Sequence, residues 1–197
     1  MDDLKSSFRI GVVADTHIPD RRKRLDSAVL AALAARQPDL IIHLGDITTP
    51  KVIQWLEQVA PVVMVRGNRD FLFYHHVPMI KELIVRGTRI RMLHGHTPDI
   101  FNYLWIKTKV WLFRYRLQWF LPRLLAFADD ADVILFGHSH IAEAVMIDGQ
   151  LFFNPGSVNV PAQGEESLSF GMLYIDEEGN VQPELCPVGV LKAKRIK

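Results

Sequence analysis

Five short apolar runs of this chain each end in a residue that can bind a metal ion. The first run, residues 10–14, is rich in β-branched side chains and stops at Asp15, with His17 two positions later. A run this short and this apolar is typical of a buried strand in an α/β sheet. Ligands of such sheets gather beyond the carboxyl ends of the strands, where Asp15 and His17 are expected to lie. Strand alternation would point both side chains to one side, so together they can bind one cation.

Four later runs repeat this arrangement along the chain. Their ends are Gly45-Asp46 after residues 39–44, Gly67-Asn68 after 61–66, His94-Gly95-His96 after 88–93 and Gly137-His138-Ser139-His140 after 131–136. One such motif is weak evidence, since a GN pair by itself marks only a turn. Five of them at strand ends favour a shared metal site over a set of isolated core residues.

The stretches between these runs predict the other elements. Residues 25–37 are good helix formers with Asp26 as the N-cap, and residues 48–59 begin with capping hydroxyls and a proline. His43 lies inside its run and is expected to be a hydrogen-bonded core residue rather than a ligand. Hairpins are expected within residues 82–93 and 143–153, and strands at 169–175 and 181–185 complete the sheets.

Composition limits the classes of function. With 197 residues and 49% hydrophobic side chains, the chain can form a substantial core. Its net charge of +1 gives no overall attraction to nucleic acid, and no specific nucleic-acid partner is indicated. The single cysteine, Cys186, excludes an internal disulfide and suits a reducing compartment. Since the N-terminus shows no signal-peptide pattern, we expect a cytoplasmic protein.

One strongly charged segment follows the first run. Arg21-Arg22-Lys23-Arg24 places four cations in a row beside the expected metal site. Such a segment either gathers an anionic substrate or is a solvated surface loop, and the residues alone leave both interpretations open.

Taken in order, the motifs resemble those of the metallophosphoesterase (calcineurin-like) superfamily, especially its small bacterial and archaeal phosphodiesterase branch. The matching residues are Asp15-x-His17, Gly45-Asp46, Gly67-Asn68-x-Asp70, His94-Gly95-His96, Gly137-His138-x-His140 and the turn Asn154-Pro155-Gly156-Ser157. The resemblance implies an α/β (α+β) fold, in which a two-sheet β-sandwich is flanked by helices in four αββα layers. It implies a single domain over residues 1–197. It also implies two metal ions, one held by Asp15, His17 and His140, the other by Asn68, His94 and His138, with Asp46 bridging them.

The donor set supports this assignment chemically. Mixed aspartate, histidine and asparagine ligation suits manganese, with Fe, Zn, Ni or Co as alternatives, better than calcium or Cu(I). Two ions about 3.5–4 Å apart can lower the pKa of a bridging water, and the resulting hydroxide attacks phosphorus in line. The expected activity is therefore metal-dependent phosphodiester hydrolysis of a small phosphoester substrate, without a protein nucleophile.

The residue after Asn68 departs from the pattern of many relatives. They place a histidine there, where it can stabilise or protonate the leaving group, whereas this chain has Arg69. A guanidinium can clamp a phosphate oxygen but cannot serve as an acid. Asp70 is expected to orient Arg69 or a ligand, and His96 is the nearest alternative proton donor. Asn68, Arg69, Asp70 and His96 are thus the candidate catalytic residues.

The second departure is an aromatic and basic insertion over about residues 99–130. Its part from 100 to 121 is expected to be helical, with a second helix starting at Arg123 after Pro122. The insertion either covers the core or forms a lid, a homo-oligomer interface or a membrane-surface element. Interior cations exclude a membrane-spanning helix.

Two alternative functions remain open. The stretch from Gly67 to Phe71, with the insertion, also resembles the UDP-diacylglucosamine pyrophosphatases, which implies hydrolysis of a lipid-linked or nucleoside-diphosphate pyrophosphate bond under a helical lid. The second alternative is a non-catalytic metal-binding scaffold, like the retromer subunit of this fold. Such scaffolds tend to lose metal ligands, and none of the seven is missing here.

Overall fold

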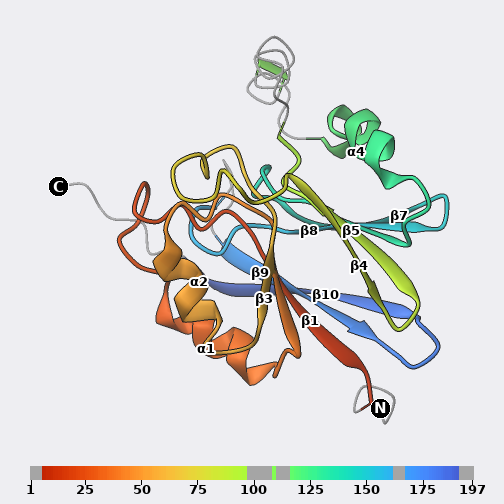
Figure 1. The fold of residues 1–197 in the computed structure, drawn as a ribbon, viewed down its shortest axis with the longest axis horizontal. Coiled ribbons are helices and arrows are strands. Elements are labelled where there is room, and N and C mark those ends of the chain that lie inside the picture. The colour runs from red at the N-terminus through yellow and green to blue at the C-terminus, as the bar shows by residue number, and fades with distance from the viewer. Residues whose placement is uncertain (1–5, 97–107, 110–115, 162–166, 191–197) are drawn as a thin grey trace.

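Two five-stranded β-sheets pack face to face in the computed structural model, with helices on both outer faces (Figure 1). The structure describes residues 6–96, 108–109, 116–161 and 167–190. This is the α/β sandwich, helix–sheet–sheet–helix, that the family resemblance implies, and the predicted fold class is confirmed.

The first sheet has the strand order β10-β9-β1-β2-β3. Strands β1 to β3 run parallel to each other, and β9 pairs antiparallel with β1 and with β10. Their bounds are β1 Phe8–Val13, β2 Leu40–His43, β3 Val62–Met64, β9 Ser167–Ile175 and β10 Val181–Val190. The carboxyl ends of β1, β2 and β3 therefore meet at one edge of this sheet.

The second sheet has the order β4-β5-β6-β8-β7, with β5, β6 and β8 parallel at its centre. The bounds are β4 Ile80–Val85, β5 Thr88–Leu93, β6 Val133–Leu135, β7 Ala142–Ile147 and β8 Gln150–Pro155. Strand β8 runs two residues further than expected, because Asn154 and Pro155 still pair with β7. Proline is tolerated at this strand end.

Helices α1 (Ser27–Ala35) and α2 (Pro50–Leu56) cover the outer face of the first sheet (Figure 1). The Asp26 carboxylate caps α1 by accepting the Ala28 N–H at 2.9 Å, as predicted. A 3₁₀ turn, η2 (Leu117–Trp119), and helix α4 (Leu121–Ala128) cover the second sheet. None of the helices in the described ranges is long and apolar enough to cross a bilayer.

Strand alternation builds three apolar layers from neighbouring residues. In β2, Ile42 faces the other sheet and packs with Val12, while Ile41 faces the helices and packs with Leu33. The third layer lies under α4, where Leu124 packs on strand residues of the second sheet. The central strands of each sheet are thereby covered on both faces, whereas alternate positions of the edge strands β4 and β7 remain exposed.

The insertion is described only in part. Pro122 lies in the first turn of α4, as expected, but Leu117 to Trp119 form a 3₁₀ turn rather than a continuous helix. Residues 97–107 and 110–115 lie outside the described ranges. The lid, interface and membrane interpretations of 100–121 therefore stay predictions.

Candidate metal centre

Asp15 and His17 lie in the loop directly after β1. Both have positive φ, 56° and 48°, so the chain has left strand geometry before it reaches them. The Asp15 N–H donates to the Gly45 carbonyl at 3.1 Å and the His17 N–H donates to the Asp46 carbonyl at 3.0 Å. Strand alternation was expected to point both side chains to one side, and this reason was wrong. The two side chains are instead oriented by a loop with left-handed residues, which is hydrogen-bonded to the loop after β2.

The first ligand group combines both sheets. The His140 Nε2 lies 3.3 Å from Asp15 Oδ1 and 3.1 Å from His17 Nε2, and His17 Nε2 lies 3.6 Å from the same carboxylate oxygen. These three residues offer ligand atoms that all lie within 4.8 Å of one another. They are the three that the resemblance assigns to one metal ion.

A second ligand group shares Asp15 with the first. It contains Asp15, Asp46 and His94, again with ligand atoms within 4.8 Å of one another. The His94 Nδ1 donates to the Leu44 carbonyl at 2.7 Å, which leaves Nε2 unprotonated and available as a ligand. Asn68 Oδ1 and His138 Nδ1 lie 3.1 Å and 3.2 Å from that Nε2. All seven residues predicted as ligands are thus brought to one place.

The charges in this centre favour a cation. Asp15 Oδ1 is buried and has no hydrogen-bond partner, although three histidine Nε2 atoms lie within 4.0 Å of it. Burial acts to raise the pKa of Asp15, but the neighbouring histidines together outweigh it and hold that pKa well below its usual range, through the charge and hydrogen bond of His140, the hydrogen bond of His17 and the charge of His94. Burial raises the pKa of Asp46, and burial lowers the pKa of His138 to about 3. Buried carboxylates clustered with imidazoles fit a divalent metal ion, which would replace the protons that now balance their charge.

Several residues that hold the centre in place were missed by the sequence interpretation. The Ser157 hydroxyl donates to the Asp15 carbonyl at 2.9 Å, and the Asn159 amide donates to the Thr16 carbonyl at 2.6 Å. Ser157 lies in the turn that carried the family resemblance, but nothing in that turn indicated which backbone it would bind. Both residues are buried and fix the loop after β1 from the far end of the chain.

The comparisons with known proteins agree with this geometry. The family model of the calcineurin-like phosphoesterase superfamily domain matches residues 8–178. The chain belongs to this superfamily. A probable metallophosphoesterase of Methanothermobacter thermautotrophicus is 32% identical over 169 residues, which cover 86% of this chain and 87% of the relative. The phosphodiesterase YfcE of Escherichia coli K12 is 31% identical over 134 residues, which cover 64% of this chain and 60% of YfcE.

Solved structures show the same fold. The crystal structure of Vps29 from Chaetomium thermophilum superposes with a TM-score of 0.65 at 22% identity, covering 93% of this chain and 99% of Vps29. At that level of identity the likeness concerns the fold alone. The predicted family is therefore confirmed by the family model and the sequence relatives.

Arg69 lies at the exposed rim of this phosphoesterase's metal centre. Its backbone N–H donates to Asp46 Oδ1 at 2.9 Å, and its guanidinium pairs with Asp20 at 3.1 Å. About 40% of the Arg69 side chain is exposed, so it can reach a bound ligand. Asn68, before it, is also exposed.

Asp70 has a different neighbourhood from the one expected. It is fully buried, and its two oxygens accept the Thr48 and Gly67 N–H groups, each at 2.8 Å. The bond to Thr48 ties the loop after β3 to the loop after β2, so both Asp70 oxygens bind backbone N–H groups rather than the Arg69 guanidinium. A catalytic role for Asp70 stays a prediction, whereas its hydrogen bonds show a structural role in joining the two loops.

His96 lies beside the ligands His94 and His138. Its ring centre is 5.4 Å from that of His94, and its buried Nδ1 makes no hydrogen bond. Burial lowers the pKa of His96 to about 4, with the charges of His94, Arg123 and Arg66 acting in the same direction. A neutral imidazole at neutral pH can accept or relay a proton, but it is a poor acid.

Proposed function

We propose that this protein is a metal-dependent phosphodiesterase with a dinuclear centre. The observation that carries the proposal is the pair of ligand groups that share Asp15, one completed by His17 and His140, the other by Asp46 and His94. Two overlapping groups suit two neighbouring cations better than one. The relationship to YfcE, a phosphodiesterase, supports the choice of a diester substrate.

The ligand roles in this proposal follow the motif assignment. Asp15, His17 and His140 would hold one cation and Asn68, His94 and His138 the other. Asp46 would serve both, because it too lies between the groups, with Oδ2 3.7 Å from His17 Nε2 and Oδ1 3.5 Å from His94 Nε2. When bound, two divalent cations, with manganese proposed first, supply Lewis acidity toward phosphate and lower the pKa of a water molecule.

The chain's own residues bind and orient the substrate. Arg69, at the exposed rim, can donate two hydrogen bonds to a phosphate oxygen pair once it exchanges its Asp20 partner. The hydroxyls near the centre are already engaged, since Ser157 donates to Asp15 and Ser139 accepts from Asn154 at 2.9 Å. Among the described residues, neither of these hydroxyls is hydrogen-bonded to an imidazole or carboxylate that could activate it as a nucleophile.

A hydrolysis assay with matched variants tests the proposal. The substrates are an aryl phosphodiester and the corresponding monoester, each with Mn, Zn, Ni or Mg added. Asp46→Asn should reduce turnover of the diester by about a hundredfold or more, because replacing even outer partners of metal ligands costs 10–100-fold. Asp39→Asn is the control, since Asp39 is exposed and its carboxylate accepts the Arg9 N–H in a separate part of the first sheet. Full turnover in chelator, or an Asp46→Asn variant as active as Asp39→Asn, would refute the proposal.

A second assay tests the position of Arg69. Without an acid there, the rate should depend steeply on the pKa of the leaving group, so aryl diesters should react faster than alkyl diesters. Arg69→His should flatten that dependence if the side chain faces the leaving group. An unchanged slope with a raised KM would make Arg69 a phosphate clamp only.

A scaffold function is the second candidate, because the fold likeness includes Vps29, a vacuolar protein sorting protein by its name. Metal binding without hydrolysis of any phosphoester in the assay above would favour it. The pyrophosphatase alternative requires a nucleoside-diphosphate lipid in the same assay, and hydrolysis of that substrate alone would favour it.

A further inference from the structure

Three neighbouring apolar side chains point into solvent beside the metal centre. Phe71, Leu72 and Phe73, here named the apolar tip, are 74%, 66% and 47% exposed. They follow Asn68 and Arg69 within the loop between β3 and β4. Two phenylalanines and a leucine in succession are an unusual content for a solvated loop, because burying any one of them would be favourable.

The loop that carries the apolar tip is fixed at both of its ends. The Tyr74 N–H donates to the Asp70 carbonyl at 3.0 Å, and the Val77 N–H donates to the Tyr74 carbonyl at 3.0 Å. Arg66 also donates from its guanidinium to the His75 carbonyl at 2.6 Å. Tyr74 and Val77 are buried in the core, so the same loop anchors two side chains and exposes three. The exposure is therefore a property of a folded loop.

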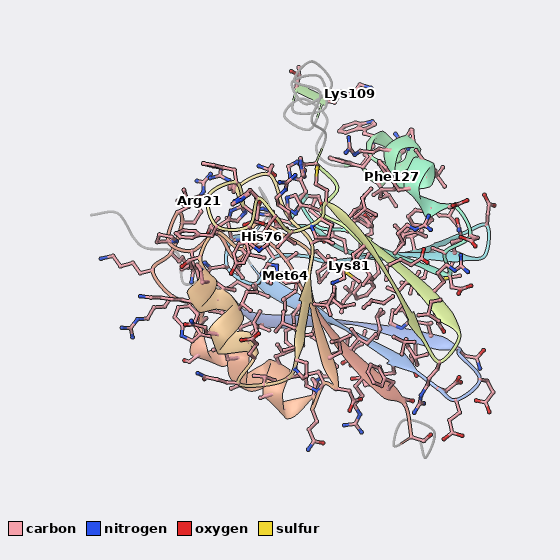
Figure 2. The ribbon with its side chains drawn as sticks, in the orientation of Figure 1. Arg21, Met64, His76, Lys81, Lys109 and Phe127 are labelled. Atoms are coloured by element: carbon pink, nitrogen blue, oxygen red, sulfur yellow. The ribbon has the colours of Figure 1, made fainter. Side chains whose placement is uncertain are left out.

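Four cations lie next to this loop. Arg21 to Arg24, here named the basic loop, directly follow Asp20, and the Asp20 carboxylate pairs with Arg69 at 3.1 Å. Arg69 is two residues before the apolar tip. Arg21 and His76, from the two loops, lie at the same end of the molecule (Figure 2). Three of the four cations, Arg21, Lys23 and Arg24, are exposed.

We propose that the apolar tip and the basic loop form one docking surface for an anionic phospholipid bilayer. The three apolar side chains would enter the boundary between headgroups and acyl chains, and the cations would contact lipid phosphates. We favour a bilayer over a protein partner because four successive cations beside exposed apolar side chains match the polybasic clusters that anionic lipid headgroups attract. Docking in this way would bring the Asp46 side of the metal centre close to the headgroups. The proposal does not depend on the hydrolytic function.

Vesicle sedimentation of the full chain tests this surface. The probes are vesicles of phosphatidylcholine alone and of phosphatidylcholine with phosphatidylserine, at low and high salt. Partition should require phosphatidylserine and should fall in 0.5 M salt. Salt screens the attraction between the cations and the lipid phosphates, because the Debye length falls from about 8 Å at 0.15 M to about 3 Å at 1 M. Replacing Phe71 and Phe73 by serine should weaken partition about tenfold or more, because each apolar side chain contributes strongly when buried.

The chain offers a matched apolar control. Ile84 and Met146, in β4 and β7, are 64% and 62% exposed, outside the apolar tip. Serine at these two positions also removes two largely exposed apolar side chains and should leave partition unchanged. All of these substitutions are on the surface, and a thermal unfolding curve for each variant verifies that the fold is kept.

The basic loop is tested in the same assay. Replacing Arg21, Lys23 and Arg24 by glutamine should weaken partition into anionic vesicles by about fivefold for each charge removed. Equal binding to both vesicle types, equal loss in the Ile84 and Met146 control, or no binding at all would overturn the proposal. Conversion of a dimer to a monomer by the Phe71 and Phe73 substitutions, without vesicle binding by the wild type, would assign the surface to a second copy instead.

Discussion

His43 provides a test of how the loops around the metal centre are held. It is fully buried at the end of β2, and its Nδ1 accepts the Gly45 N–H at 3.1 Å. The proton of the neutral ring is therefore on Nε2, which donates to the Thr16 hydroxyl at 3.3 Å. That hydroxyl donates in turn to the Asp46 carbonyl at 3.1 Å. The chain of bonds links the loop after β1 to the loop after β2, and it requires His43 to stay neutral.

The pH dependence of stability follows from this requirement. Burial lowers the pKa of His43 from 6.5 to about 3. Below pH 6.5 His43 binds a proton in the unfolded chain but stays neutral in the folded chain. The contribution of His43 to stability therefore falls as the pH falls towards 3. At about 1.4 kcal/mol per pH unit, lowering the pH from 7 to 5 should reduce the free energy of unfolding by about 2 kcal/mol through this residue.

Urea unfolding of wild type and His43→Asn, both in chelator, isolates this effect. Asparagine can still accept the Gly45 N–H but takes up no proton, and all other histidines are common to both proteins. The variant should be less stable at pH 7, because it loses the bond to Thr16 and leaves a small cavity. The difference in free energy of unfolding between wild type and variant should be about 2 kcal/mol smaller at pH 5 than at pH 7, because only the wild type is destabilised through His43. Parallel stability curves from pH 7 to pH 5 would show that His43 does not titrate as the structure requires.

Three further predictions concern the centre and the core. Gly67→Ala should abolish metal-dependent hydrolysis, because the added Cβ would lie 2.2 Å from Asp46 Oδ1. Gly87→Ala is the control and should remain active in the same assay, since a Cβ at Gly87 would meet nothing within 4 Å. Manganese at about a hundred times its dissociation constant should stabilise the protein by about 2.7 kcal/mol, and chelator should reverse the shift in melting temperature; an unchanged melting temperature would argue against a metal site. The buried Cys186 thiol, whose pKa burial raises to about 11, should react with a thiol reagent only after unfolding in urea, and rapid reaction of the native protein would contradict its placement.

The strand ends could be predicted from sequence because their signals are local. An apolar run that stops at a polar residue indicates both a buried strand and the point where it emerges, as with Val13 before Asp15 or Leu93 before His94. The helix cap at Asp26 and the core position of His43 were predicted correctly for the same reason, since each depends on a few neighbouring residues.

Contacts between distant segments could not be predicted in this way. Ser157 donates to the backbone of Asp15 across 142 positions, and no pattern in either segment indicates the other. The partners of Asp70 were missed for a related reason. A carboxylate after a GN turn suggests a functional group, whereas two backbone N–H groups, from Thr48 and Gly67, occupy it here.

The metal centre also joins the two sheets, and this explains why its residues come from both. The His138 N–H, in the loop after β6, donates to Asp15 Oδ2 at 2.9 Å, and His94, after β5, donates to the Leu44 carbonyl, after β2. Each bond connects the carboxyl end of a strand in one sheet to the carboxyl end of a strand in the other. A cation shared by Asp15, His17 and His140 would add a further connection of the same kind. Metal binding should therefore stabilise the packing of sheet on sheet, so that loss of the metal weakens the sandwich first at the edge that carries the ligand groups.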